Sequence, residues 1–259
     1  MHDTSELYRE ILAGEHWTET RLAIGESGRL IDRFGSAITF GGTAISVGSS
    51  GADSGFGENV LISIETSNRM FSEESITVGS CVSGEIDVEI IKPAGEIVRM
   101  ARLVPYVRIT NGSRHSEWIQ KGVYFIDTRE ENSDDSGIVI LKLHGYDAML
   151  KAEADYPESA LAWPAADIEV VREIAAFMGV TVDPRTAAAM TRAYPVQYPA
   201  EYSCREVLGY IAAMYGGCFV MSDLGELRLI TLGGMPAETR YLIASSGSAI
   251  TFGGDRILV

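Results

Sequence analysis

Apolar and polar positions form their most regular pattern between Ser116 and Tyr156. A strand-like stretch, Gly122 to Thr128, is followed by a charged turn from Arg129 to Gly137 and by a second apolar run from Ile138 to Leu143. Two such runs joined by a turn that ends in glycine predict a β-hairpin. At His144-Gly145 the spacing becomes helical, so we expect a short helix to follow directly, with one side formed by Ala148, Met149 and Ala152.

The residues before this hairpin predict mainly strands. A short helix is indicated from Glu6 to Ala13, where apolar residues recur at helical spacing and Gly14 follows. Short β-like runs split by glycines extend from Thr18 to Val47, and the glycine- and serine-rich segment Gly48 to Gly57 is typical of an exposed loop. A further strand is expected from Val60 to Glu65.

Another strand is expected from Leu103 to Thr110. Pro105 within it has no backbone N–H to donate, which predicts a sheet edge or the start of a strand. Asn111-Gly112 then predicts a tight turn that leads into the hairpin.

The segment Val82 to Ile90 alternates between apolar and acidic residues, as a half-buried strand does. Its carboxylates, Glu85, Asp87 and Glu89, would project from one face. A calcium site or an acid/base pair is one interpretation. A solvated sheet face explains the same pattern, and we favour it because no Asn/Asp/Gly ligand loop lies nearby.

Two amphipathic helices are predicted after Tyr156. The first ends at Gly179, and its apolar stripe consists of Ile168, Val171, Ile174, Ala175 and Met178. The second begins at Ser203, with Glu206 three residues later in the spacing of a capping box, and ends at Gly216-Gly217. Its apolar face consists of Val207, Ile211, Met214 and Tyr215.

An extended connector is expected between these helices, because prolines separate Tyr194, Tyr198 and Tyr202 despite their four-residue spacing. A second hairpin, Cys218 to Met221 with Glu226 to Leu232, follows the helices. The helical pair is therefore predicted to be an insert between β elements.

An internal repeat is present: GSAITFGG occurs at Gly35 to Gly42 and again at Gly247 to Gly254. We interpret the two copies as parts of two related β-modules. The expected organisation is a first β-barrel-like domain with an N-terminal helix at 1–150, a helical α/β insert with its closing hairpin at 151–235, and the beginning of a second β-module at 236–259. The last strand then pairs with the first module or a neighbouring subunit, or the sequence is a fragment of a longer protein. The fold class is α+β, with mostly antiparallel strands.

The charge is the unusual feature of the composition. Among 259 residues, 21 Lys and Arg face 36 Asp and Glu, a net charge of −15. So acidic a surface repels phosphate backbones, which argues against sequence-specific nucleic-acid binding. No apolar run is long enough for a membrane span, and no signal peptide is recognisable at the N-terminus, so we expect folding in a reducing cytoplasm.

Candidate chemistry is sparse. Cys81, Cys204 and Cys218 form no CxxC pair, so we expect buried free thiols. The four histidines, His2, His16, His115 and His144, form no metal-ligand pattern, and His144 favours a capping or buried hydrogen-bonding role. The pairs Gly41-Gly42 and Gly253-Gly254 lack the lysine of a phosphate-binding loop. We predict no catalytic, cofactor-binding or metal-binding residue, no cofactor and no enzymatic activity.

Several longer runs resemble a known family. They are GSCVSGEIDVEIIKP, PYVRITNGSRHSEWIQKGVYFIDTRE, LHGYDAMLKAE, VVREIAAFMGV and YPAEYSCREVLGYIAAMYGG. They are similar to the tail-hub proteins of long-tailed phages and prophages, variously named baseplate hub, tail-associated lysozyme or prophage tail endopeptidase amino-terminal region. The resemblance extends from about Glu6 to Val259.

The resemblance implies a homotrimeric ring at the virion tail tip, made in the cytoplasm of a bacterial host. Two related β-barrel-like domains per subunit would give this ring pseudo-sixfold symmetry. Its implied partners are the distal tail protein, the tape-measure protein, and spike, fibre or lytic parts. An acidic lumen that lets DNA slide through is a further hypothesis.

Two other functions stay open from the residues. One is a cell-wall-degrading or peptidase enzyme of the tail tip, although no nucleophile motif is present. The other is a carbohydrate-binding host-recognition module, for which exposed clustered aromatics would be typical. Trp17, Trp118 and Trp163 fall at element boundaries without clustering, which disfavours it.

Overall fold

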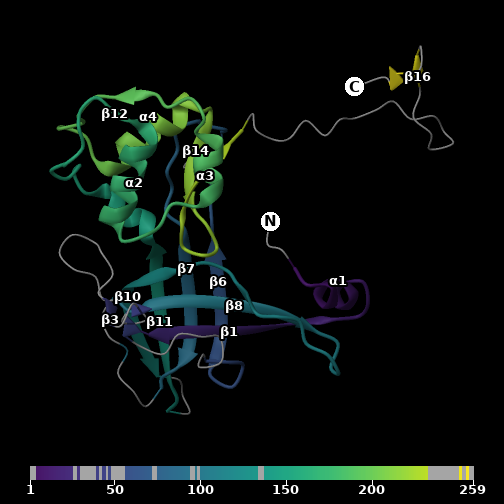
Figure 1. The fold of residues 1–259 in the computed structure, drawn as a ribbon. Helices are drawn as coiled ribbons and strands as arrows, with labels where there is room; N and C mark the ends of the chain where they lie inside the picture. Colours follow the sequence, from purple (N-terminus) through teal and green to yellow (C-terminus); the bar gives the residue numbers. More distant parts are fainter. Residues whose placement is uncertain are drawn as a thin grey trace.

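The structure is a computed structural model of the chain. It describes residues 4–25, 56–71, 75–93, 97, 100–133 and 137–232, together with the backbone of the short pairs 28–29, 39–40, 43–44, 46–47, 251–252 and 255–256. These residues form an antiparallel sheet with a helical part packed at one end of it (Figure 1). The predicted α+β fold class is confirmed.

The main sheet has seven strands in the described residues, in the order β1-β8-β10-β11-β7-β6, with β9 beside β8. Their bounds are β1 (Trp17–Gly25), β6 (Leu61–Ser67), β7 (Glu85–Ile91), β8 (Arg102–Thr110), β9 (Ile119–Gln120), β10 (Tyr124–Ser133) and β11 (Val139–Asp147). All pairings are antiparallel. β1 and β8 run across the direction of β6, β7 and β11, so the sheet is strongly bent (Figure 1).

The bent sheet wraps around one hydrophobic core. Each of its six longer strands contributes at least one buried side chain, among them Leu22, Leu61, Ile86, Leu103, Tyr124 and Leu143. The two edges of the sheet approach each other at a single bridge, where Leu22 exchanges backbone hydrogen bonds of 2.9 and 2.7 Å with Phe56. In the described residues the strand ladder does not continue around into a closed barrel.

The predicted central hairpin is confirmed as β10 and β11, but the expected change to helix at His144-Gly145 is wrong. Both residues are paired on two sides, with β10 and with β7, which holds them in the strand. β11 therefore continues to Asp147, whose carboxylate caps the short 3₁₀ helix η2 (Ala148–Glu153). Ala148, Met149 and Ala152 are buried on one side of that helix, as predicted.

The expectation for Pro105 is also wrong, since it lies inside β8 with β1 on one side. Its partner Leu22 directs both backbone groups away from β8, toward Phe56, so this pair needs no proline N–H. On its other side β8 changes partner from β10 to β9 near this point. Proline is tolerated here because the pairing of β1 with β8 requires no backbone N–H donor at this position.

The helical part contains three α-helices and two small sheets in the described residues. Their bounds are α2 (Asp167–Met178), α3 (Pro184–Ala189), α4 (Cys204–Met214), β12 (Ala165–Ala166) with β13 (Pro195–Val196), and β14 (Gly217–Met221) with β15 (Leu227–Thr231). The predicted apolar stripe of α2 is buried apart from Ile168, which is half-buried. Gly179 ends this helix with a left-handed φ of 75°.

The predicted capping box of α4 is present. The Ser203 hydroxyl accepts from the backbone N–H of Glu206, and the Glu206 carboxylate accepts from the backbone N–H of Ser203 at 2.8 Å. Val207 and Ile211 are buried, whereas Met214 is exposed. The second hairpin is confirmed as β14 and β15.

A second core lies within the helical part and includes Val171, Ile174, Met178, Leu208, Ile211 and Phe219. One stretch from the first part of the chain joins it: Cys81 is buried in this core. The backbone of Gly79 donates to Gly217 at 2.7 Å, and Phe219 donates to Ser80 at 3.2 Å. The domain boundaries at residues 150 and 235 stay predictions.

The repeated octapeptides lie largely outside the described residues, with one described feature in common. In the first copy β3 (Thr39–Phe40) pairs with β4 (Thr43–Ala44), and in the second β16 (Thr251–Phe252) pairs with β17 (Asp255–Arg256). The registers correspond: Phe40 faces Thr43, and Phe252 faces Asp255. The remaining described pair of this region joins β2 (Gly28–Arg29) to β5 (Ser46–Val47). That the copies belong to related modules stays a prediction.

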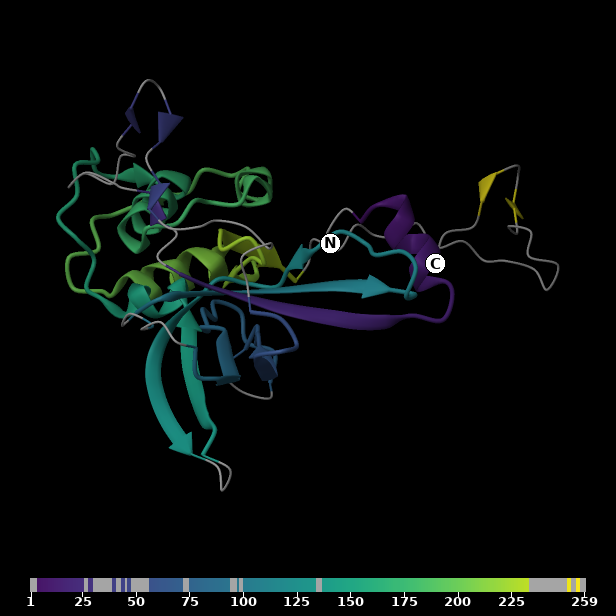
Figure 2. The same cartoon turned by 90° about the horizontal axis from the view of Figure 1, so that it is seen from below.

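Helix α1 (Glu6–Leu12) confirms the predicted N-terminal helix. It lies at the outer end of the long β1–β8 pair, well away from the helical part (Figure 2). We call this projecting portion, formed by Trp17–Arg21 of β1 and Tyr106–Thr110 of β8, the arm.

Candidate functional site

The acidic stripe predicted between Val82 and Ile90 is found on β7, where it faces basic partners on β11. His144 Nδ1 lies 2.7 Å from Asp87 Oδ1, and Lys142 Nζ lies 2.6 Å from Glu89 Oε1. These are directly opposed residues of the two strands. The hydrogen bond with Glu89 raises the pKa of Lys142. The stripe thus carries one cross-strand ion pair, Lys142–Glu89, and one cross-strand hydrogen bond, His144–Asp87. No group of His, Cys, Asp and Glu in the described residues is arranged to hold a metal ion.

The histidines have separate surroundings. His16 Nδ1 lies 2.9 Å from the carbonyl of Gly14, His115 lies 3.5 Å from Glu19, and His144 contacts Asp87 and packs edge-on against Tyr146. His2 lies outside the described residues. His144 lies within a strand and forms a hydrogen bond without acting as a helix cap.

The three cysteines are buried free thiols, as predicted. Burial raises the pKa of Cys81 to about 12 and that of Cys204 to about 11. The protonated form therefore dominates at neutral pH, and these two thiols are poor nucleophiles.

A pocket of about 430 Å³ lies where the sheet and the helical part meet. Its walls come from segments far apart in the sequence, anchored to each other by the backbone bonds of Gly79 and Ser80 to the β14 strand. The polar residues that line it are Asn68, Arg69, Asp147, Arg185, Ser222, Asp223 and Arg228, and the apolar ones include Met70, Val82, Val220, Leu224 and Ile230. No local motif joins these residues, so the sequence alone did not indicate the pocket.

Asp147 forms one wall of this pocket. Its carboxylate accepts backbone hydrogen bonds from Gly84 at 2.7 Å and from Met149 at 2.9 Å. Burial nevertheless raises the pKa of Asp147 to about 6, outweighing these two hydrogen bonds and the nearby charge of Arg205.

A second wall carries two arginines beside one buried carboxylate. Asp183 is 1% exposed and caps α3, accepting from the backbone N–H of Arg185 and from its guanidinium Nε, each at 2.9 Å. The hydrogen bond from Arg185 lowers the pKa of Asp183, and the charge of Arg228 acts in the same direction. The Nε of Arg228 is buried and has no hydrogen-bond partner in the part of the chain that the structure describes.

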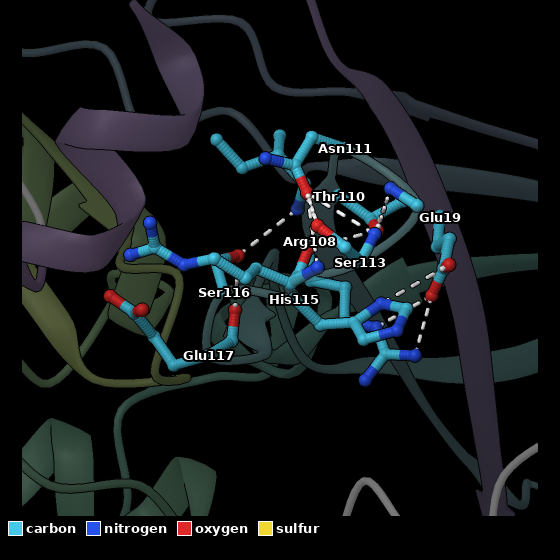
Figure 3. A network of polar contacts seen from close by, with 11 residues as sticks. Glu19, Arg108, Thr110, Asn111, Ser113, His115, Ser116 and Glu117 are labelled. Carbon is cyan, nitrogen blue, oxygen red and sulfur yellow. Dashed lines mark hydrogen bonds and ion pairs between the residues drawn. The ribbon is translucent and has the colours of Figure 1, made fainter.

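The arm carries a dense network of polar contacts, shown in Figure 3. Glu19 on β1 accepts a 2.6 Å hydrogen bond from Arg108 on β8, and His115 approaches the same carboxylate. The indole of Trp118 contacts two guanidinium groups, with centroid distances of 4.7 Å to Arg21 and 4.4 Å to Arg108. Such cation–π contacts are attractive and connect Trp118 to β1 and β8.

The predicted Asn-Gly turn closes the end of β8. The Asn111 side chain accepts from the backbone N–H of Arg114 at 3.0 Å, and Gly112 has a φ of 87°. The chain after the turn holds α1 in place. Glu117 accepts from both the backbone and the hydroxyl of Ser5, at 2.8 and 2.6 Å.

The outer edge of β1 has backbone groups that do not face β8. Leu22 directs its N–H and C=O toward Phe56, away from β8. Ile109, the partner of Thr18, directs its own backbone groups toward Ser116, away from β1. Because backbone direction alternates along an antiparallel strand, Thr18 and Thr20 also point their N–H and C=O groups away from β8. Beyond the Leu22 bridge, this edge has no strand partner among the residues described. An edge strand with outward backbone groups can pair with a strand of another chain.

Trp163 contacts two tyrosines. Its ring centroid lies 5.3 Å from that of Tyr198 and 6.2 Å from that of Tyr156. The connector brings Tyr198 back onto the loop before α2, which the sequence spacing did not indicate. Tyr156 in turn donates to Glu173 on α2.

None of the helices in the described part of the chain is both long and apolar enough to cross a membrane.

Comparison with known proteins gives structural matches alone. No protein-family model matches the chain. No curated protein matches it either. The chain is similar to the 43 kDa tail protein of prophage MuSo2 from Shewanella oneidensis (TM-score 0.44, 13% identity, covering 82% of this chain and 52% of that one). It is also similar to the tail protein from Neisseria meningitidis MC58 (TM-score 0.44, 10% identity, 82% and 51%).

A chain of the half-lidded Francisella PdpA-VgrG complex is similar as well, with a TM-score of 0.41 and 8% identity over 82% of this chain and 31% of that one. The present chain spans about half the length of the two tail proteins.

Proposed function

We propose that this protein is a structural component of a phage or prophage tail, acting at the tail tip as part of the hub. The observation that carries the proposal is the arm with its free edge. A projecting pair of strands, stiffened by ion pairs and capped by a helix, is suited to contact neighbouring subunits. The resemblance of the sequence to tail-hub proteins supports the same function.

The arm is suited to strand pairing because its free edge is polar and regular. Thr18 and Thr20 direct backbone donors and acceptors outward, and both side chains are small and β-branched. A strand from another polypeptide could add to this edge through main-chain hydrogen bonds. Glu19, Arg108 and Trp118 link the strands of the arm to each other and to the segment after its turn.

The hub is proposed to be a homotrimeric ring that caps the tail tube. In this arrangement the distal tail protein, the tape-measure protein and spike or fibre proteins are the partners. Residues 1–150 are proposed as the first hub domain, 151–235 as the insert and 236–259 as the start of a related module. The proposed role is architectural and involves no catalysis.

Two substitutions at one position test the role of the edge. Thr20→Pro removes an outward N–H while leaving the β1–β8 ladder intact, and Thr20→Val keeps the N–H and a β-branched side chain. We expect the parent protein and Thr20→Val to form concentration-dependent trimers in light scattering and to co-elute with a distal tail protein. Thr20→Pro is expected to lose at least one of these associations. Equal association by all three proteins contradicts the role of the edge.

A turbidity assay on bacterial cell walls tests the enzyme alternative. The proposed architectural function predicts that the wall suspension does not clear. Clearing by the purified chain, without any association with tail proteins, would overturn the proposal.

A further inference from the structure

The pocket between the sheet and the helical part has features that the proposed tail function does not use. It is lined by segments from both parts of the molecule, and its volume of about 430 Å³ falls in the range of small-ligand sites. Arg69, Arg185 and Arg228 reach it from three separate segments, although the protein as a whole has a net charge of −15.

The acidic groups around the pocket are already engaged. Asp147 accepts two backbone hydrogen bonds, and Asp223 lies 3.9 Å from Lys121. Asp183 does not line the pocket itself, and both of its carboxylate oxygens accept hydrogen bonds from the Nε of Arg185. Asp183 lies near the guanidinium groups of both Arg185 and Arg228, and Glu226 also acts on Arg185, so Arg185 is already balanced by carboxylates.

Two buried arginine Nε donors lack a hydrogen-bond partner in the described residues, those of Arg205 and Arg228, and of the two residues only Arg228 lines the pocket. Arg228 extends from β15, opposite Val220, and its buried Nε lacks an acceptor among the described residues. A buried donor of a charged group that is left unsatisfied costs stability, and an incoming anion that reorients the guanidinium would recover that cost. Arg69, which is exposed at the rim, adds a second positive charge.

The other residues that line the pocket indicate which class of anion it would bind. Met70, Val82 and Leu224 provide apolar surface that suits a hydrocarbon body. Asp147 and Asp223 would repel a doubly charged phosphate more strongly than a singly charged carboxylate. We propose that this pocket binds a carboxylate carried on an apolar body, with Arg228 and Arg69 contacting the carboxylate. The inference does not depend on the tail function.

Calorimetric titration of the full chain tests the site with four probes at constant ionic strength. Hexanoate represents a free organic acid, and N-acetyl-Ala-Ala-Leu with a free carboxyl terminus represents a peptide. The amide of the same peptide lacks the negative charge, and inorganic phosphate lacks the apolar body. We expect one or both carboxylates to bind, the tighter one identifying the source, and the amide and phosphate to bind about tenfold more weakly or worse.

Arg228→Gln is the decisive variant and Arg172→Gln its matched control. Arg172 is an exposed residue of α2 outside the pocket lining, so its substitution removes the same charge elsewhere. Arg228→Gln should weaken carboxylate binding about tenfold or more, and Arg172→Gln should leave it unchanged. If Arg228→Gln does not fold, as judged by circular dichroism, Arg69→Gln at the exposed rim replaces it with the same expectation.

Three results would overturn the inference: no binding of either carboxylate, equal binding of the amide or phosphate, or equal losses in the pocket and control variants. Loss of the site would leave the association experiments on Thr20 unaffected, so the two proposals fail separately.

Discussion

The carboxylate of Asp147 accepts a 2.7 Å hydrogen bond from the backbone N–H of Gly84 and so connects the end of β11 to the residue just before β7. Its other oxygen accepts from Met149, in the first turn of η2. One side chain thereby fixes three chain segments at the place where the two cores meet. A Cβ at position 84 would lie 2.8 Å from this carboxylate, so the contact also depends on glycine.

Asp147 is expected to make stability depend on pH. Burial raises its folded pKa to about 6, above the ordinary value of 3.8. The folded chain therefore binds the proton of the Asp147 carboxyl more tightly than the unfolded chain does. The stabilisation from protonating Asp147 is complete below the unfolded pKa and is lost as the pH rises through the folded pKa. Lowering the pH from about 7 to about 5 should add about 1 kcal/mol from this group.

Urea unfolding of the parent and of Asp147→Asn at both pH values measures this contribution. The variant removes the buried charge that is unfavourable at neutral pH, so at about pH 7 it should be at least as stable as the parent although it loses one backbone hydrogen bond. Its free energy of unfolding should change less between the two pH values than that of the parent, by about the 1 kcal/mol assigned to Asp147. An identical pH dependence in the two proteins would show that Asp147 does not titrate in this range.

The capping box of α4 should contribute measurably to stability. Ser203→Ala removes the acceptor for the Glu206 backbone N–H and is expected to lower the free energy of unfolding by about 1 kcal/mol. Ser75→Ala, at an exposed loop position, serves as the control. A loss of equal size in both variants would contradict a specific role for the cap.

Gly145 is expected to tolerate no side chain. A Cβ at this position would lie 2.5 Å from the backbone oxygen of Phe125 on the neighbouring β10 strand. Gly145→Ala should therefore displace the hairpin and cost about 1–3 kcal/mol of unfolding free energy. Gly25→Ala has nothing within 4 Å and is the matched control. Little change at Gly145 would mean that β10 and β11 can separate at low cost.

Glu117 should hold α1 against the arm. The helix has seven residues, too few to be stable alone, and Glu117 satisfies both donors of its N-cap residue Ser5. Glu117→Ala is expected to accelerate amide hydrogen exchange in Glu6–Leu12, whereas Glu15→Ala, also exposed, should not. Unchanged exchange would indicate that Ile11 packing and the Glu10–Arg114 ion pair retain the helix without Glu117.

The sequence predicted those elements whose signals are local. The β10–β11 hairpin, the α2 stripe with Gly179 and the α4 capping box depend on residues within one turn or one strand of each other. Helix α3 was missed because its short alanine-rich sequence has no apolar stripe. Asp183 followed by Pro184 is nevertheless a cap followed by a favourable first residue, and this signal could have identified it.

Features that depend on distant partners could not be predicted. Pro105 was misplaced because the partner change of β8 is a property of the sheet, and the length of β11 follows from its pairing with β7. The pocket combines Arg69, Asp147 and Arg228 from three segments, and no spacing rule links them. The buried thiols were predictable because cysteine favours burial in any such fold.

The placement of Cys81 in the second core has a consequence for how the chain is completed during synthesis. The ribosome releases Gly79, Ser80 and Cys81 long before Gly217 and Phe219, the residues with which two of them share backbone hydrogen bonds. The apolar side of this segment therefore stays uncovered until the β14–β15 hairpin has emerged. A nascent chain arrested before β14 should leave the Cys81 thiol open to alkylation, and completion of translation should close it.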